Sequence, residues 1–318
     1  MTNLSLSLTE SAARYPDAAV LRCDDVTTTY SMLAADVASF ADYLIDGGLE
    51  PGDRVGVILP NGPAFAVVFY GVLHAGGVVV PMSPSLSFRA VEFYSTVTDA
   101  RILFYGGRRA VATDLAAVTA GTQPVRVGKH GIATLTAGFA GRTQPVDRAE
   151  DDIAVTVYAS GTTGVPKVTQ LTHAALARNG SVIARSVLDL GSDDVVMGCL
   201  PLFEGFGLSC GLLAAVSAGA TLVLLPRFAS RRVLEMIAAE WVTVFEGMPA
   251  MYRSMLAAAD RYQLDFSSLR VCLSIGASMP ADTLSRFEDK FGCTVVQATE
   301  SAFVDDWLVT GAIGGAEA

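Results

Sequence analysis

The chain has 318 residues, 51% of them hydrophobic, so it is long enough to bury a large core in one or two domains. Its 22 Lys and Arg against 32 Asp and Glu give a net charge of −10, which argues against binding to nucleic acid or anionic membranes. The five dispersed cysteines suit a reducing cytoplasm, and the first residues up to Glu10 show no signal-peptide pattern.

The first half of the chain alternates helix-like and strand-like segments. A helix over residues 32–46 has its apolar residues on one face, and Ser31 precedes it as the expected cap. Asn61 and Pro63 occupy the expected cap and first-turn positions of a further helix. The other predicted elements are helices over 8–19, 87–97 and 108–118, strands over 27–30, 54–59, 78–81, 101–105 and 124–127, and an irregular connection over 128–150.

A segment rich in glycine and hydroxyl residues lies between Tyr158 and Lys167. It follows an alternating apolar strand and precedes a helical pattern that opens near Thr172. Glycines let the backbone approach a phosphate closely, hydroxyls add donors and a lysine adds positive charge. It is not a Walker A loop, because two residues separate Gly164 from Lys167 and Val168 follows the lysine. The residues expected to hold phosphate are Ser160, Gly161, Thr162, Thr163, Gly164 and Lys167.

The second half of the chain repeats the alternation of strands and helices. An uncharged run over 205–226 is long enough to cross a bilayer, but Ala218, Gly219 and Ala220 divide it into a helix and a strand, so no membrane span is predicted. The predicted strands are 195–200, 221–225, 242–246, 269–274 and 294–297, and the predicted helices are 207–217, 230–240, 249–259 and 280–291.

This order of elements predicts an α/β fold of two packed α/β subdomains, with mostly parallel sheets flanked by helices. The expected subdomains are 50–188, which holds the glycine-rich segment, and 1–49 with 189–300; residues 301–318 form an irregular tail. Ligands of such sheets bind at the carboxyl ends of the strands, where the glycine-rich segment lies.

The glycine-rich segment resembles the phosphate-binding loop of the adenylate-forming (AMP-binding) superfamily, and the chain as a whole resembles the N-terminal part of acyl-CoA synthetases. Val168 departs from the family pattern, which has glycine after the lysine. Further segments that match in the right order are 29–33, 51–55, 74–81, 200–203, 247–252 and 276–277, so the resemblance covers nearly the whole chain.

The resemblance implies roles for particular residues. The loop would bind the phosphates of ATP, and Glu300 would approach Mg²⁺. The substrate pocket would include Phe203, Glu204 and Gly247, and the adenine side would include Gly276, Ala277, Ser278 and Thr299. The family's Gly-Tyr-Gly before Thr299 is absent, and its ribose-binding aspartate motif and its C-terminal domain with the catalytic lysine find no match. We therefore expect a truncated form, for which a separate chain could supply the C-terminal domain, and assign no catalytic residue.

The function implied by the resemblance is ATP-dependent activation of a carboxylic acid, fatty or aryl, as an acyl-adenylate, with CoA or a carrier protein as acceptor. Two alternatives remain open. One is a catalytically silent protein that binds nucleotide or a partner. The other is an amino-acid adenylation module, which rests on Glu204 alone. In each case the expected location is the cytoplasm.

Overall fold

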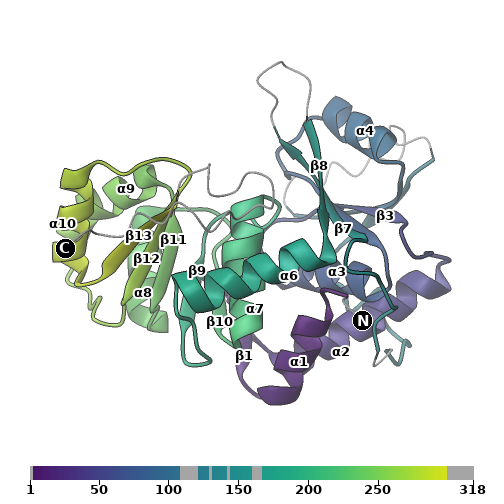
Figure 1. Ribbon diagram of the computed structural model, residues 1–318, viewed down its shortest axis with the longest axis horizontal. Coiled ribbons are helices and arrows are strands. Elements are labelled where there is room, and N and C mark those ends of the chain that lie inside the picture. Colours follow the sequence, from purple (N-terminus) through teal and green to yellow (C-terminus); the bar gives the residue numbers. More distant parts are fainter. Residues whose placement is uncertain (1–2, 108–120, 129–130, 142–143, 160–166, 299–318) are drawn as a thin grey trace. The chain divides into compact units, whose positions relative to one another are not determined.

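The computed structural model describes residues 3–107, 121–128, 131–141, 144–159 and 167–298 (Figure 1). They belong to two compact units, each with its own sheet. The first unit comprises Met1–Asp17, Thr28–Ala177 and Leu202–Gly205, and the second comprises Ala18–Thr27, Arg178–Pro201 and Phe206–Ala318.

The first unit contains a six-stranded sheet in the order β6-β5-β3-β4-β7-β8. Its neighbouring strands run parallel except β7 and β8, which are antiparallel. The strands are β3 Arg54–Ile58, β4 Val78–Pro81, β5 Ala100–Tyr105, β6 Gln123–Arg126, β7 Ile153–Ala159 and β8 Lys167–Thr172. The helices are α1 Leu6–Arg14, α2 Tyr30–Asp46, α3 Pro63–His74 and α4 Phe88–Val97.

The second unit contains a seven-stranded sheet in the order β13-β12-β11-β9-β10-β1-β2. Its strands are β1 Ala19–Cys23, β2 Val26–Thr29, β9 Val195–Gly198, β10 Thr221–Leu224, β11 Val244–Gly247, β12 Val271–Ile275 and β13 Thr294–Ala298. The remaining helices are α6 His173–Val182, α7 Ala214–Ala218, α8 Ser230–Glu240, α9 Pro249–Ala259 and α10 Ala281–Phe291, with two π-helices, η1 Ile183–Val187 and η2 Gly207–Leu213. These two mostly parallel sheets flanked by helices confirm the predicted α/β fold class.

The main core of the second unit lies between one face of its sheet and helices α8, α9 and α10 (Figure 1). Residues spaced by four turn the same side of α10 inward, so Thr283, Phe287 and Phe291 are buried. The ring of Tyr252 on α9 lies edge-on to the rings of Phe287 and Phe245. The distances between ring centroids are 4.8 Å to Phe287 and 5.2 Å to Phe245 of β11. Edge-to-face contacts of this kind stabilise the packing beyond the buried area alone.

In the first unit, helices α2 and α3 pack very closely at one glycine. A Cβ at Gly71 of α3 would stand 2.5 Å from Cδ1 of Phe40 on α2, closer than carbon atoms can approach. Phe40 itself is fully buried and lies edge-on to Phe104 of β5. Glycine at position 71 therefore permits the close contact of the two helices.

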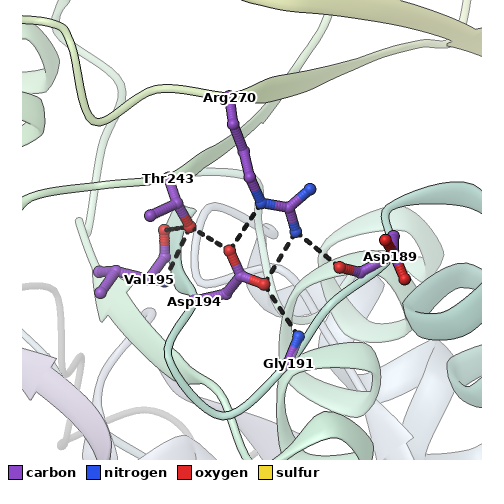
Figure 2. A network of polar contacts seen from close by, with 6 residues as sticks. All are labelled: Asp189, Gly191, Asp194, Val195, Thr243 and Arg270. Atoms are coloured by element: carbon purple, nitrogen blue, oxygen red, sulfur yellow. Dashed lines mark hydrogen bonds and ion pairs between the residues drawn. The ribbon is translucent and has the colours of Figure 1, made fainter.

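A polar network joins the amino ends of β9, β11 and β12 (Figure 2). Arg270 donates from Nε and Nη2 to the two carboxylate oxygens of Asp194, both at 2.8 Å, and Nη2 also donates to the carbonyl of Asp189. Thr243 donates to Asp194 at 2.6 Å, and the Gly191 amide donates to it at 2.8 Å. The residues that precede three neighbouring strands are thus tied together at the edge opposite their carboxyl ends.

Several local predictions were wrong. Helix α2 is capped by Thr29, which accepts a hydrogen bond from the Met32 amide, rather than by Ser31. Helix α3 is preceded by Gly62, and Asn61 instead accepts a hydrogen bond from the Leu202 amide. The predicted helix over 8–19 ends at Arg14, and Ala19 already belongs to β1.

The uncharged run over 205–226 contains η2, α7, a turn with Gly219 in the left-handed conformation, and β10. The predicted division at residues 218–220 is confirmed. Within the described residues, no helix combines the length and hydrophobicity that a bilayer crossing requires. The predicted helix over 108–118 and the predicted tail over 301–318 lie outside the described residues.

Candidate functional site

The glycine-rich segment connects β7 to β8 at the carboxyl edge of the first unit's sheet. Strand β7 runs parallel to β4, so the two strands end at the same edge. Ala159, the last residue of β7, pairs with Lys167, the first residue of β8, so the segment between them closes a hairpin. Ser160, Gly161, Thr162, Thr163 and Gly164 lie outside the described residues, and only the backbone of Lys167 is described.

The expected strand–loop–helix arrangement at this segment is wrong. Residues Lys167–Thr172 form β8, and α6 begins only at His173. The segment therefore stands between two antiparallel strands and not at the amino end of a helix. Any phosphate held there would have to be bound by loop amides, hydroxyls and the lysine, without help from a helix dipole.

Two of the predicted substrate-pocket residues, Phe203 and Glu204, belong to the first unit, as the glycine-rich segment does. The Leu202 amide donates to Oδ1 of Asn61 at 2.9 Å, and Asn61 follows the carboxyl end of β3. This bond holds Phe203 and Glu204 near that edge of the sheet. Glu204 is exposed, yet partial desolvation by the surrounding protein raises the pKa of its carboxyl.

In the second unit, β11, β12 and β13 end side by side, because Gly247 pairs with Ser274 and Ile275 pairs with Ala298. The chain then turns at Gly276, whose φ of +88° is a conformation that favours glycine. Ala277 and Ser278, predicted for the adenine side, are exposed in this turn. The Met279 amide donates to Gln297 of β13 at 2.9 Å and fixes the end of the turn.

Gly247, predicted for the substrate pocket, has a packing reason of its own to be glycine. A Cβ there would stand 2.9 Å from the ring of Phe245 and 3.2 Å from Sδ of Met251. Position 247 therefore has little room for any side chain. Thr299 and Glu300, which follow β13 in the sequence, lie outside the described residues.

Glu246 is a residue that the sequence interpretation missed. It is 1% exposed in the middle of a fully buried strand, and burial raises the pKa of its carboxyl to about 8. Its Oε1 has no hydrogen-bond partner among the described residues. The available signal was a single carboxylate in an otherwise apolar strand; the sequence interpretation treated it as the end of that strand.

No cluster of three or more histidine, cysteine or acidic residues suited to a metal ion occurs within the described part of the chain. Glu300, the residue expected to approach Mg²⁺, lies beyond that part. The assignment of Mg²⁺ therefore rests on the sequence resemblance alone.

Comparisons with known proteins give a consistent result. Residues 8–310 match the family model described as AMP-binding enzyme. The chain is 29% identical over 324 residues to a long-chain-fatty-acid–CoA ligase of Bacillus subtilis (strain 168), in an alignment that covers 91% of this chain and 58% of that protein. It is 33% identical over 294 residues to a feruloyl-CoA synthase of Amycolatopsis sp, with 90% of this chain and 57% of that protein covered.

Solved structures agree on the fold. The inhibitor-bound N-terminal domain of FACL13 from Mycobacterium tuberculosis superimposes with a TM-score of 0.87 at 27% identity, covering 94% of this chain and 75% of that chain. Against the two curated relatives, by contrast, this chain spans less than two thirds of their length.

Proposed function

Because the chain belongs to the AMP-binding enzyme family, we propose that it uses ATP to activate a carboxylic acid as an acyl-adenylate, with CoA as the acceptor of the acyl group. The similar curated proteins are named for a long-chain fatty acid and for a feruloyl group, so a fatty or aryl acid is the proposed substrate class. The curated relatives are longer than this chain, and the activity of the whole protein is part of the proposal.

The observation that carries the proposal is the position of the glycine-rich segment. It joins β7 to β8 at the edge where parallel sheets bind ligands, and Ala159 and Lys167 pair directly on either side of it. Its two glycines, three hydroxyls and one lysine supply the groups that bind phosphate. We assign the β- and γ-phosphates of ATP to Ser160, Gly161, Thr162, Thr163, Gly164 and Lys167.

In the proposed reaction a carboxylate oxygen of the acid attacks the α-phosphorus of ATP. The bond from that phosphorus to the bridging oxygen breaks, and pyrophosphate leaves with the bonding electrons. The thiolate of CoA then attacks the acyl carbon and AMP leaves. Lys167 and the loop amides would bind the charge on the leaving pyrophosphate, and donors placed in advance at a developing charge are an effective form of catalysis.

The remaining proposed contacts follow from the two sheet edges. In the second unit the turn with Gly276 and the exposed Ala277 and Ser278 is proposed for the adenine side, together with Thr299. Phe203, Glu204 and Gly247 are proposed for the acid pocket. Bound Mg²⁺ would neutralise phosphate charge, with Glu300 as the carboxylate toward it.

The first experiment measures the thermal stabilisation of the purified chain by ATP and Mg²⁺. Ligands that bind only the folded state raise the melting temperature, so the wild type should shift and Lys167→Ala should not. The matched control is Lys290→Ala, which removes the same charge from an exposed ion pair with Asp260 and should shift like the wild type. Equal shifts in all three proteins would refute the assignment of the loop.

The second experiment separates the proposed function from its alternatives. Slow acid-dependent exchange of labelled pyrophosphate into ATP, far below the rate of an ordinary ligase, should occur with fatty or aryl acids. Exchange with amino acids only, lost in Glu204→Gln, would favour an amino-acid adenylation module. Binding of ATP without exchange for any acid would favour a silent nucleotide-binding protein, or the need for a separate chain that supplies the C-terminal domain.

A further inference from the structure

Glu246 places a carboxyl group inside the second unit, on the face of the sheet away from the aromatic core. Successive side chains of a strand alternate between faces. Phe245 belongs to the core beside α8, α9 and α10, so Glu246 extends to the other face. Strand β10, which is separated from β11 by β9, follows the same alternation, with Val223 in that core and Leu222 outside it.

The π-helix η2 covers the carboxyl group of Glu246 at a glycine. A Cβ built on Gly211 of η2 would lie 3.8 Å from Oε2 of Glu246 and 3.9 Å from Cδ1 of Leu222, with nothing nearer. These are ordinary contact distances, so a methyl group would fit above the carboxyl group. The absence of a side chain at position 211 leaves this space between helix and sheet.

The described residues leave one oxygen of this carboxyl group unsatisfied. Oε1 is buried and lacks a hydrogen-bond partner among the described residues. The nearby thiol of Cys199 donates to the backbone carbonyl of Glu246 at 3.7 Å, and so not to its side chain. A buried polar group without a partner costs about 1–3 kcal/mol. An apolar side chain of similar size would avoid that cost, which argues that the carboxyl group serves a purpose other than stability.

The position of Glu246 points to the acid. It precedes Gly247, the last residue of β11, at the carboxyl edge where parallel sheets bind ligands. The covering helix η2 begins at Gly207 and belongs to the same unit as β11. Helices of the π type are frequent at functional sites.

We infer that Glu246 is a specificity-determining residue that selects acids bearing a hydroxyl group on the acyl part. This inference rests on the proposed function. A protonated carboxyl group donates through its O–H and accepts through its carbonyl oxygen, so it matches a hydroxyl, which also does both. Burial keeps Glu246 uncharged near neutral pH, since it raises the pKa to about 8. A site built to bind a hydroxyl rejects the analogue that lacks it, because its own polar group is then left unpaired.

The test uses stable acyl-sulfamoyl adenosines, which mimic the acyl-adenylate and need no turnover. Three pairs differ only in a hydroxyl: hydroxybenzoyl and benzoyl, hydroxycinnamoyl and cinnamoyl, and terminal hydroxydodecanoyl and dodecanoyl. Calorimetry on the full chain should give at least about 10-fold tighter binding for the hydroxylated member of one pair. Glu246→Met should abolish that preference while it retains binding of the unsubstituted member.

Glu246→Gln is the second variant, because an amide keeps a donor and an acceptor and should retain most of the preference. If the methionine variant does not fold, the comparison of affinities within each pair for the wild type still tests the inference. Equal affinities within every pair for the wild type would overturn the inference and leave the proposed function standing, as would an unchanged preference in Glu246→Met. Failure of the wild type to bind any analogue would overturn both.

Discussion

At the scale of single residues, two buried ionisable groups act in opposite directions on stability. Burial raises the pKa of Glu246 from its ordinary 4.5 to about 8. Burial, followed by the charge of Arg148, lowers the pKa of His173 from its ordinary 6.5 to about 4, against the opposing effect of Asp152. His173 accepts a hydrogen bond at Nδ1 from the Leu4 amide at 3.0 Å, and protonation would remove that acceptor.

The signs follow from proton binding. Between pH 4.5 and 8 the folded state holds the Glu246 proton and the unfolded state does not, so rising pH lowers the free energy of unfolding. Between pH 4 and 6.5 the unfolded state protonates His173 and the folded state does not, so rising pH increases that free energy. Each slope is about 1.4 kcal/mol per pH unit. The two contributions cancel up to about pH 6.5, and the Glu246 contribution alone remains above it.

Urea unfolding across this pH range tests the balance. The wild-type stability should be nearly flat to about pH 6.5 and fall above it. Glu246→Gln should instead rise to about pH 6.5 and then level off. His173→Gln should fall throughout. The same slope above pH 6.5 in the wild type and in Glu246→Gln would contradict the burial of an ionisable carboxyl group.

At the scale of elements, the network around Asp194 holds three strands together and gives a second prediction. The side chain of Asp194 is 12% exposed, and Arg270→Met would remove the guanidinium that donates to both of its carboxylate oxygens. We expect a loss of about 1–3 kcal/mol in the free energy of unfolding, the cost of an unsatisfied, largely buried acceptor. The control is Arg286→Met, which breaks an exposed helix pair with Asp282 and should change stability by less than about 0.5 kcal/mol.

The contact of α2 with α3 gives a third prediction. Gly71→Ala would place a methyl group against Phe40, and overpacking of this kind costs about 1–3 kcal/mol. Phe40→Leu combined with Gly71→Ala should cost less than the sum of the two single changes, because the clash is relieved. Gly191→Ala, where a Cβ meets nothing within 4 Å, is the control and should be nearly neutral. If the cost of the double change equals the sum of the two single costs, a methyl group at position 71 does not clash with Phe40.

Some elements were well predicted because strong local signals mark their ends. Helices α8 and α9 have the predicted bounds, one preceded by an irregular segment and the other opened by proline. Strand β8 was missed because its sequence, Lys-Val-Thr-Gln-Leu-Thr, alternates only weakly, and its pairing with β7 is a tertiary contact. The π-helix η2 was predicted as an ordinary helix because periodicity does not distinguish the two hydrogen-bond patterns.

The candidate site, like the fold, could be predicted from the sequence only in part. Glycines, hydroxyls and a lysine in sequence indicate phosphate binding, because their chemistry is local. The oxygen of Glu246 that lacks a hydrogen-bond partner among the described residues could not be predicted. Its meaning depends on the face of β11 to which it extends and on a glycine of η2 distant in the sequence. Contacts between side chains of different elements depend on the fold, and no short motif encodes them.

At the scale of the whole molecule, the chain spans 58% of the Bacillus ligase, and three groups to which the family resemblance assigns parts of the reaction find no match in these 318 residues. They are the lysine of the C-terminal domain, the tyrosine against the adenine and the aspartate at the ribose. A charge partner of a transition state contributes roughly 2.7–4 kcal/mol. An aromatic stack on a base contributes roughly 1–3 kcal/mol.

Without the aspartate these contributions total about 4–7 kcal/mol, or three to five decades of catalytic efficiency at ~1.4 kcal/mol each, if they add. Parts of one site seldom add fully, so the lower end is the safer figure. These 318 residues by themselves should therefore bind ATP weakly and form almost no acyl-CoA. The measurement is CoA thioester formation by the purified chain with short, long and aromatic acids. Turnover above about 1 s⁻¹ would show that other groups replace the missing ones, and Glu204 would then be the first residue to substitute.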